Sequence, residues 1–377
     1  MKYFIVAGEA SGDLHASNLV KELNLVDKDA SISGWGGELM KSAGVKILKH
    51  YKELAFMGFT EVLLNIRTIK KNFDLCKKQI QDFEPDALVF VDYPGFNLRM
   101  AKWAKSKGYK VFYYISPSVW AWKESRVELV RKYTDRMFVI LPFEKPFYKK
   151  HEIEVEFEGH PLVDAVHAKK QLMPSREKFI SEHNLGPKPL IAILPGSRKQ
   201  EISVMLPIMS NLQAYFPEYS FVVAGTSVFS NAYYEQFMQE QKLPIVYDAT
   251  HELLNYSHAG LIKSGTSTLE AALYDLPQIV CYMGGALSVW IAKKVAKVKY
   301  ISLPNLILDE PVLTELIQSD LTVENLKVRL KEIVSETDTR SRMLTAYNRL
   351  KEVLGDTGAS ARVAAKIFSL TKSANAI

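Results

Sequence analysis

The stretch YFIVAGEASGDL, residues 3–14, decides the fold because it joins a short apolar strand to a helix through a glycine turn. Residues 3–7 are apolar, and the turn GEASGD at 8–13 opens a helical pattern that carries Leu14, Leu19 and Leu23. A strand, a glycine turn and a helix in this order form the first unit of a doubly wound α/β domain. The glycine spacing is not the GxGxxG of dinucleotide sites, which argues against a nicotinamide cofactor.

A second unit of this kind begins at residue 190. The apolar run 190–194 precedes Pro-Gly-Ser-Arg at 195–198 and a helical pattern from Glu201, and it places Arg198 where an anion would bind. Other apolar runs alternate with helical segments, at 87–91, 110–115, 137–140, 221–224, 259–262 and 278–281. The alternation predicts two Rossmann-like, doubly wound domains with parallel sheets.

The 377 residues suffice for two domains of ordinary size. We expect a boundary between Pro161 and Pro174, where the alternation pauses. The predicted division is an N-terminal domain at 1–165, a C-terminal domain at 166–354, and a last helix within 355–377 that packs back on the first domain.

The composition is that of a soluble globular protein, with 47% hydrophobic and 24% charged residues. Cys76 and Cys281 have neither metal-binding nor redox spacing, which is typical of a reduced, cytoplasmic protein. The first apolar run is too short for a signal peptide, and no run approaches the roughly 20 apolar residues of a membrane span. A net charge of +6 permits an anionic partner without requiring nucleic acid.

The polar turn KSGTSTLE at 263–270 precedes another helix. Its backbone N–H groups and hydroxyls suit a diphosphate at a helix N-terminus, and Glu270, one turn later, suits ribose hydroxyls. Ordinary helix capping by serine and threonine is the alternative.

Ten blocks of sequence resemble the lipid-A-disaccharide synthase family in order and spacing. They include GEASGD at 8–13, MGFTEVL at 57–63, DYPGFN at 92–97, SPSVWAW at 116–122, LPFE at 141–144, GHPLVD at 159–164, LPGSRKQEI at 194–202, SGTSTLE at 264–270 and LPNLI at 303–307, with ELIQ at 315–318 in agreement. The resemblance implies a GT-B glycosyltransferase, whose two domains face one another across a cleft. The implied reaction joins UDP-2,3-diacylglucosamine to 2,3-diacylglucosamine 1-phosphate (lipid X) and yields a β-1,6 lipid A disaccharide 1-phosphate and UDP.

Such an inverting transfer needs a base near the acceptor hydroxyl. Asp92 follows the apolar run 87–91 and is the expected base; Glu9 and Asp13, on the first turn, are the other carboxylates expected in the cleft. Asp92 could instead cap the turn at 93–95, and Asp13 could be a helix cap. The family often carries a second acid where this chain has Gly95, so no role is assigned there.

The remaining site residues are predicted to bind substrate. On the acceptor side they are Gly8, Ser11, Gly12 and Asn97, and on the donor side Arg198, Ser264, Gly265, Thr266, Glu270 and Asn305. Arg198 could instead form an ion pair with Glu201, and Asn305 could be a turn former. Arginine and helix dipoles supply the positive charge, and there is no DxD motif, so we expect neither a metal nor a cofactor.

Two segments are candidates for peripheral membrane contact on the cytoplasmic face of the inner membrane. Residues 56–69 are unusually apolar and precede Lys70 and Lys71, and residues 287–299 combine Trp290 with four lysines. Core packing is the alternative for both. A homodimer is a further expectation. Two other classes stay open: a different GT-B enzyme, such as a UDP-GlcNAc epimerase or a soluble-sugar transferase, and a non-catalytic nucleotide-sugar-binding protein.

Overall fold

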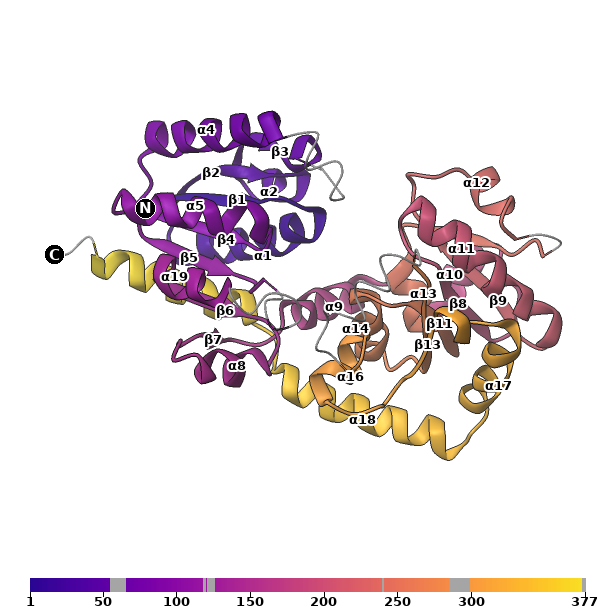
Figure 1. Ribbon diagram of the computed structural model, residues 1–377. Coiled ribbons are helices and arrows are strands. Elements are labelled where there is room, and N and C mark those ends of the chain that lie inside the picture. Colours follow the sequence, from indigo (N-terminus) through magenta and orange to yellow (C-terminus); the bar gives the residue numbers. More distant parts are fainter. Residues whose placement is uncertain (55–65, 118–119, 121–125, 239–240, 285–298, 375–377) are drawn as a thin grey trace. The chain divides into compact units, whose positions relative to one another are not determined.

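The computed structural model describes residues 1–54, 66–117, 120, 126–238, 241–284 and 299–374 (Figure 1). Its tertiary contacts divide the chain into two units. Unit 1 comprises Met1–Asp164 and Gly355–Ile377, and unit 2 comprises Ala165–Leu354. Each unit is built around one sheet in which all paired strands are parallel. The predicted α/β fold with two doubly wound domains is confirmed.

The sheet of unit 1 has seven strands in the order β3-β2-β1-β4-β5-β6-β7. The strands are β1 (Lys2–Ala7), β2 (Ser31–Gly36), β3 (Lys46–His50), β4 (Ala87–Val91), β5 (Val111–Tyr114), β6 (Arg136–Val139) and β7 (Glu156–Phe157). The helices are α1 (Ala10–Val26), α2 (Glu38–Ser42), α4 (Ile66–Phe83), α5 (Pro94–Ser106), α7 (Val127–Tyr133), α8 (Glu144–Lys150) and α19 (Ala359–Ala374), and α9 (Pro161–Leu172) begins in this unit and continues into unit 2.

Alternate residues of β1 enter two different cores, which is why helices cover both faces of this sheet. Phe4 and Val6 pack with residues of α4, α5 and α7. Tyr3, Ile5 and Ala7 pack with residues of α1, α2 and α19. The inner strands β1, β4 and β5 therefore consist almost entirely of apolar residues.

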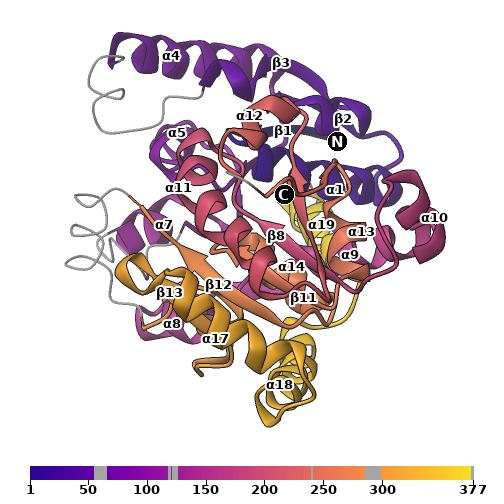
Figure 2. The ribbon, with the colours of Figure 1, turned by 90° about the vertical axis from the view of Figure 1, so that its right-hand side faces the viewer.

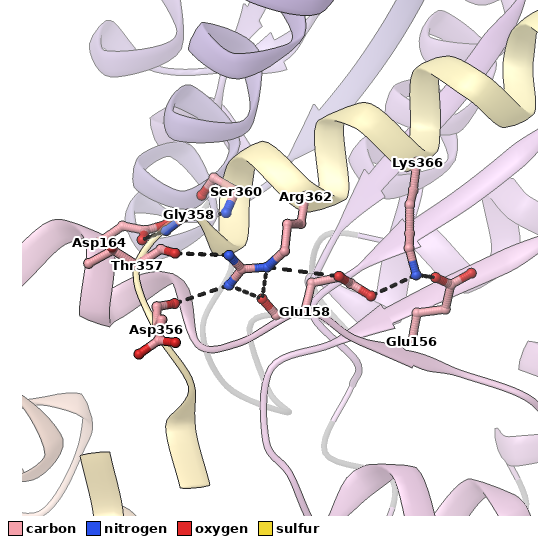
Figure 3. Close-up of polar contacts among 9 residues, drawn as sticks. All are labelled: Glu156, Glu158, Asp164, Asp356, Thr357, Gly358, Ser360, Arg362 and Lys366. Carbon is pink, nitrogen blue, oxygen red and sulfur yellow. Dashed lines mark hydrogen bonds and ion pairs between the residues drawn. The ribbon is translucent and has the colours of Figure 1, made fainter. Parts of the chain in front are cut away.

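Polar contacts hold the start of α19 on unit 1 (Figure 3). The carboxylate of Asp164 accepts hydrogen bonds from the N–H groups of Gly358, at 2.6 Å, and Ser360, at 3.2 Å. Arg362 donates to the carbonyl oxygen of Glu158 at 2.7 Å, and Lys366 forms an ion pair with the carboxylate of Glu158, also at 2.7 Å. Asp164 thus caps α19 at the point where the chain leaves unit 1.

The sheet of unit 2 has six strands in the order β10-β9-β8-β11-β12-β13. The strands are β8 (Leu190–Leu194), β9 (Ser220–Gly225), β10 (Ile245–Tyr247), β11 (Ala259–Lys263), β12 (Gln278–Tyr282) and β13 (Thr314–Ile317). The helices are α10 (Arg176–Glu182), α11 (Lys199–Ser210), α12 (Asn231–Glu235), α13 (Thr250–Tyr256), α14 (Thr266–Leu273), α16 (Leu303–Leu308), α17 (Val323–Val334) and α18 (Asp338–Leu354). Helix α17 packs across β11, β12 and β13 (Figure 2).

The strand order reverses between β1 and β4 in unit 1 and between β8 and β11 in unit 2. In open α/β sheets, ligands bind at the carboxyl ends of the strands that flank such a reversal. Residues 8–9 and 92–93 follow β1 and β4, and residues 195–198 and 264–265 follow β8 and β11; helix α1 already begins at Ala10, within the predicted turn at 8–13. Each unit therefore places two of the predicted loops at its own switch point.

Candidate active site

Asp92 lies at the switch point of unit 1 on an unusual backbone. Asp92 and Tyr93 both have left-handed conformations, with φ angles of 45° and 48°. The carbonyl oxygen of Asp92 accepts hydrogen bonds from the hydroxyl of Tyr113, at 2.6 Å, and from Nδ2 of Asn97, at 2.8 Å. Non-glycine residues in this conformation cost roughly 1–3 kcal/mol each and are concentrated at functional sites. Tyr113 and Asn97 hold Asp92 in this strained position.

The surroundings of Asp92 change its acidity. Burial, and secondly the negative charge of Glu9, raise the pKa of the Asp92 carboxyl to about 6, although a hydrogen bond from the N–H of Tyr93 opposes both. Glu9 is close because β1 and β4 pair with Ala7 opposite Val91. A carboxylate with a pKa near neutrality is suited to general-base catalysis.

The glycine turn after β1 makes room for Tyr93. A Cβ atom on Gly8 would lie 2.3 Å from Cδ1 of Tyr93, so a larger residue would displace the ring. Glu9 and Ser11 are exposed, whereas Gly12 is buried, and a Cβ on it would lie 3.4 Å from Cβ of Ala7. Ser11 and Glu9 are thus accessible to a ligand, and Gly12 packs helix α1 against the sheet.

Asp13 has the contacts of a structural residue. Its buried carboxylate accepts hydrogen bonds from the N–H groups of Gly37, at 2.7 Å, Met40, at 3.1 Å, and Leu39, at 3.2 Å. These groups belong to the start of α2, so Asp13 caps that helix, while Glu9 occupies the N-cap of α1. A catalytic role for Asp13 stays a prediction, and these contacts do not favour it.

An apolar cavity of about 260 Å³ lies beside Tyr93, between α4 and the start of α5. Its described lining consists of Ile69, Asn72, Phe73, Tyr93, Gly95, Phe96 and Arg99. The rings of Phe73 and Phe96 stack with their centroids 4.3 Å apart, and Arg99 is exposed. The sequence did not indicate this cavity, because its walls come from two helices that meet only in the fold.

A second cavity, of about 340 Å³, lies at the carboxyl ends of β8, β9 and β11 in unit 2. Its lining consists of Leu194, Gly196, Ser197, Glu201, Ala224, Gly225, Thr226, Thr250, Lys263, Gly265, Thr266 and Ser267. Gly265 and Thr266, predicted donor residues, are among them. The hydroxyl of Ser264 points elsewhere and donates to the carbonyl oxygen of Ile301 at 2.8 Å.

Glu201 organises the charged groups at this cavity. Its carboxylate forms an ion pair with Lys263 at 3.0 Å and accepts a hydrogen bond from the N–H of Ser197 at 3.0 Å. Burial raises the pKa of Glu201, but Lys263 and the N–H groups of Ser197 and Arg198 outweigh burial and lower it overall. Gly196, with φ 110°, is needed because a Cβ there would lie 2.4 Å from Oε2 of Glu201.

Arg198 also approaches Glu201, but only at 3.8 Å, and its side chain is 65% exposed. The ion pair between Arg198 and Glu201, which the sequence left open as an alternative, therefore exists, but the distance between its charged atoms is long. An exposed pair of this kind is weak and leaves the guanidinium able to turn toward an anion. Lys263 is the cation to which sequence reasoning gave no role, although it is the first residue of the predicted turn at 263–270 and ends β11.

The two remaining donor-side residues differ in availability. Burial raises the pKa of Glu270, and its carboxylate has no hydrogen bond within the described part of the chain. Asn305 is completely buried, donates to the carbonyl oxygen of Leu313 at 2.9 Å and accepts from the N–H of Leu313 at 2.8 Å. These bonds are those of the turn former that the sequence offered as the alternative; donor binding by Asn305 stays a prediction.

Most of both predicted membrane segments lies outside the described residues, which exclude 55–65 and 285–298. Lys70 and Lys71 are exposed on α4, and Lys299 forms an exposed ion pair with Asp309. Across the ranges that the structure describes, no helix is both long and apolar enough to span a membrane. In the same ranges, no group of three His, Cys, Asp or Glu side chains could hold a metal ion.

Solved structures of sugar-nucleotide enzymes share this fold. A UDP-GlcNAc 2-epimerase from Neisseria meningitidis, bound to UDP-GlcNAc, gives a TM-score of 0.69 at 14% sequence identity and covers 98% of this chain and 100% of its own. The glycotransferase of kitacinnamycin gives 0.64 at 12% identity, with 98% of both chains covered. The chain therefore has the GT-B fold of glycosyltransferases and sugar-nucleotide epimerases.

Sequence comparison narrows this class to one family. The family model of lipid-A-disaccharide synthetase matches residues 3–367. A lipid-A-disaccharide synthase of Coxiella burnetii is 35% identical over 369 residues, 97% of this chain and 96% of the relative. One of Trichlorobacter lovleyi is 35% identical over 378 residues, 98% of both. The chain belongs to the lipid-A-disaccharide synthase family and is a glycosyltransferase of lipid A biosynthesis, so the predicted family is confirmed.

Proposed function

We propose that this enzyme transfers the sugar of UDP-2,3-diacylglucosamine to 2,3-diacylglucosamine 1-phosphate (lipid X), with inversion, to form the β-1,6 lipid A disaccharide 1-phosphate and UDP. The observation that carries the proposal is Asp92, a half-buried carboxylate on a strained backbone, with a raised pKa, at the switch point of unit 1. Asp92 takes the proton of the acceptor hydroxyl. The acceptor oxygen attacks the anomeric carbon as the bond to the UDP phosphate breaks, and UDP leaves from the opposite face.

On the donor side, the cavity at β8 and β11 supports binding of UDP. The N-terminus of α14 offers the N–H groups near Gly265 and the hydroxyl of Thr266 to the diphosphate. Arg198 and Lys263 supply positive charge that offsets the charge developing on UDP, and no metal ion is required. The carboxylate of Glu270, which has no hydrogen bond to the residues that the structure describes, is the group that would accept hydrogen bonds from ribose hydroxyls.

On the acceptor side, the cavity beside Tyr93 supports an amphiphilic substrate. Ile69, Phe73 and Phe96 form an apolar wall suited to an acyl chain, and Arg99 at its edge suits a phosphate. Because such a substrate resides in a bilayer, we propose that the enzyme binds peripherally to the cytoplasmic face of the inner membrane, through residues 56–69 or 287–299. A homodimer is also proposed.

Transfer of a radiolabelled sugar from the acylated donor to lipid X tests this function. We expect a labelled disaccharide phosphate and UDP in equal amounts, without added metal and in the presence of EDTA. A parallel reaction with UDP-GlcNAc alone examines epimerase activity, which the shared fold would permit. Epimerisation of UDP-GlcNAc, with no disaccharide from the acylated pair, would refute the proposal.

A further inference from the structure

The carboxylate of Glu315 accepts hydrogen bonds from four groups in the segment 301–305. It extends from β13, and its atom Oε1 accepts from Oγ of Ser302 at 2.6 Å, from the N–H of Ser302 at 3.0 Å and from Nδ2 of Asn305 at 3.0 Å. The N–H of Ile301 is shared between the two oxygens, at 3.0 Å from Oε2 and 3.2 Å from Oε1. One side chain therefore fixes the backbone that leads into α16.

That backbone is in turn bonded to the predicted donor turn. Ile301 is held on both sides: its N–H donates to Glu315, and its carbonyl oxygen accepts from the hydroxyl of Ser264 at 2.8 Å. Ser264 directly precedes Gly265 and Thr266, which line the donor cavity at the start of α14. Helix α16 also packs against α14. A short chain of hydrogen bonds thus connects Glu315 to the donor turn through Ile301 and Ser264.

We propose that Glu315 is a positioning residue for the donor turn, a role that rests on the proposed function of that turn in UDP binding. It has no contact with the cavity, and it acts by fixing Ile301, which orients Ser264. Preorganised N–H groups bind a diphosphate without a cost for ordering them at the moment of binding. Loosening Ile301 removes part of that advantage while leaving the groups that contact the ligand in place.

The substitution Glu315→Gln isolates this effect. With its amide oxygen in the place of Oε1, glutamine keeps the bonds from Ser302 and Asn305, and three of the four partner groups stay satisfied. Its NH2 group then takes the place of Oε2 and faces the N–H of Ile301, so two donors oppose one another. The fold of unit 2 is retained, and the constraint on Ile301 is weakened, because only its longer contact, at 3.2 Å to the position of Oε1, still has an acceptor.

Glu310→Gln is the matched control. Glu310 lies five positions earlier, its side chain is 46% exposed, and its carboxylate pairs with Arg349 at 2.7 Å. The pair is bidentate but exposed, so its loss should cost little stability. The control therefore makes the same chemical change in the same unit without touching Ile301 or Ser264.

The test is calorimetric titration of UDP into the full chain, combined with thermal melting and steady-state kinetics. We expect Glu315→Gln to weaken UDP binding by about three- to tenfold, the range of one hydrogen bond, with the Tm within about 2 °C of wild type. KM for the UDP-sugar should rise by a similar factor while KM for the acceptor is unchanged. Glu310→Gln should bind UDP within twofold of wild type.

A double-mutant cycle with Ser264→Ala tests the route through Ile301. If Ser264 and Glu315 act on the same element, their effects do not add. The Kd of the double variant for UDP should then exceed that of the poorer-binding single variant by no more than about twofold. The positioning role would be overturned if the fold-changes of the two single variants multiplied in the double variant, or if Glu315→Gln left the UDP affinity unaltered. Neither result would affect the donor site itself, because UDP binding by the wild-type chain would still support it. Failure of the wild-type chain to bind UDP would overturn the proposed function and this inference with it.

Discussion

Replacement of Asp92 by asparagine should inactivate the enzyme and at the same time stabilise unit 1. Asparagine has nearly the same shape, and the contacts from Tyr113 and Asn97 reach the backbone carbonyl of residue 92, so the strained turn is preserved. What the substitution removes is a proton acceptor and a buried negative charge. General-base catalysis contributes about 10²–10⁴-fold, so kcat should fall by that factor. UDP affinity should stay within about threefold, because the base acts on the acceptor.

The stability effect follows from the pKa. Burial and Glu9 raise the pKa of Asp92 from 3.8 to about 6, so between these values the folded state holds the proton more tightly than the unfolded chain does. The ionised carboxylate therefore lowers stability as the pH rises through 6. At pH 8 the raised pKa of Asp92 corresponds to a decrease of roughly 2–3 kcal/mol in the free energy of unfolding. We expect Asp92→Asn to unfold at a Tm roughly 5 °C higher than wild type at pH 8, with the difference vanishing below about pH 4.

Two assays check this prediction: the pH profile of kcat/KM and melting curves at pH 4 and pH 8. The wild-type rate should fall as the pH drops through about 6, because the base becomes protonated, and the variant should lack this inflection. Asp82→Asn, an exposed change near the end of α4, is the control and should alter neither quantity. Activity within tenfold of wild type, or an unchanged inflection, would remove Asp92 from the role of base. A lower Tm at pH 8 would instead identify Asp92 as a structural cap.

Three further predictions concern other parts of the chain. Arg198→Ala should weaken UDP binding about three- to tenfold in titrations with little change in Tm; reduced stability with normal UDP affinity would mean that Arg198 serves only its ion pair with Glu201. Asp164→Asn should destabilise unit 1 by about 1 kcal/mol in denaturant unfolding, since it caps α19, and should leave UDP affinity unchanged; an unaltered unfolding midpoint would contradict this role. Replacing Leu63 and Leu64 together by serine should reduce co-sedimentation with vesicles and raise KM for the acylated acceptor at constant Tm. A loss of stability of roughly 2–5 kcal/mol per leucine, with intact vesicle binding, would instead mean that the two leucines belong to the core.

The sequence alone determined the fold class, because apolar runs of about five residues that alternate repeatedly with helical segments are typical of inner strands of parallel sheets. It located β1, β4, β8 and β11 in this way, whereas the order of the strands, and with it both switch points, came from the structure. It missed β2, whose sequence SISGWG mixes polar residues and glycine with apolar ones, and β13, which is only four residues long and carries Glu315. Strands of this kind are defined by their neighbours in the sheet rather than by their own composition.

For the site, the sequence correctly placed Asp92, Glu9 and the turn at 264–266 after the ends of strands. It could do so because each of them follows an apolar run in the sequence. Tertiary structure alone decided what each polar side chain bonds to. Asp13 caps a helix that begins at Glu38, and Ser264 donates to Ile301. Those partners are backbone groups that carry no signature in the sequence, and only packing of distant segments brings them within hydrogen-bonding distance. The ion pair between Lys263 and Glu201 was missed for a similar reason. The two residues belong to different strand-helix units and meet only because β8 and β11 are neighbours in the sheet.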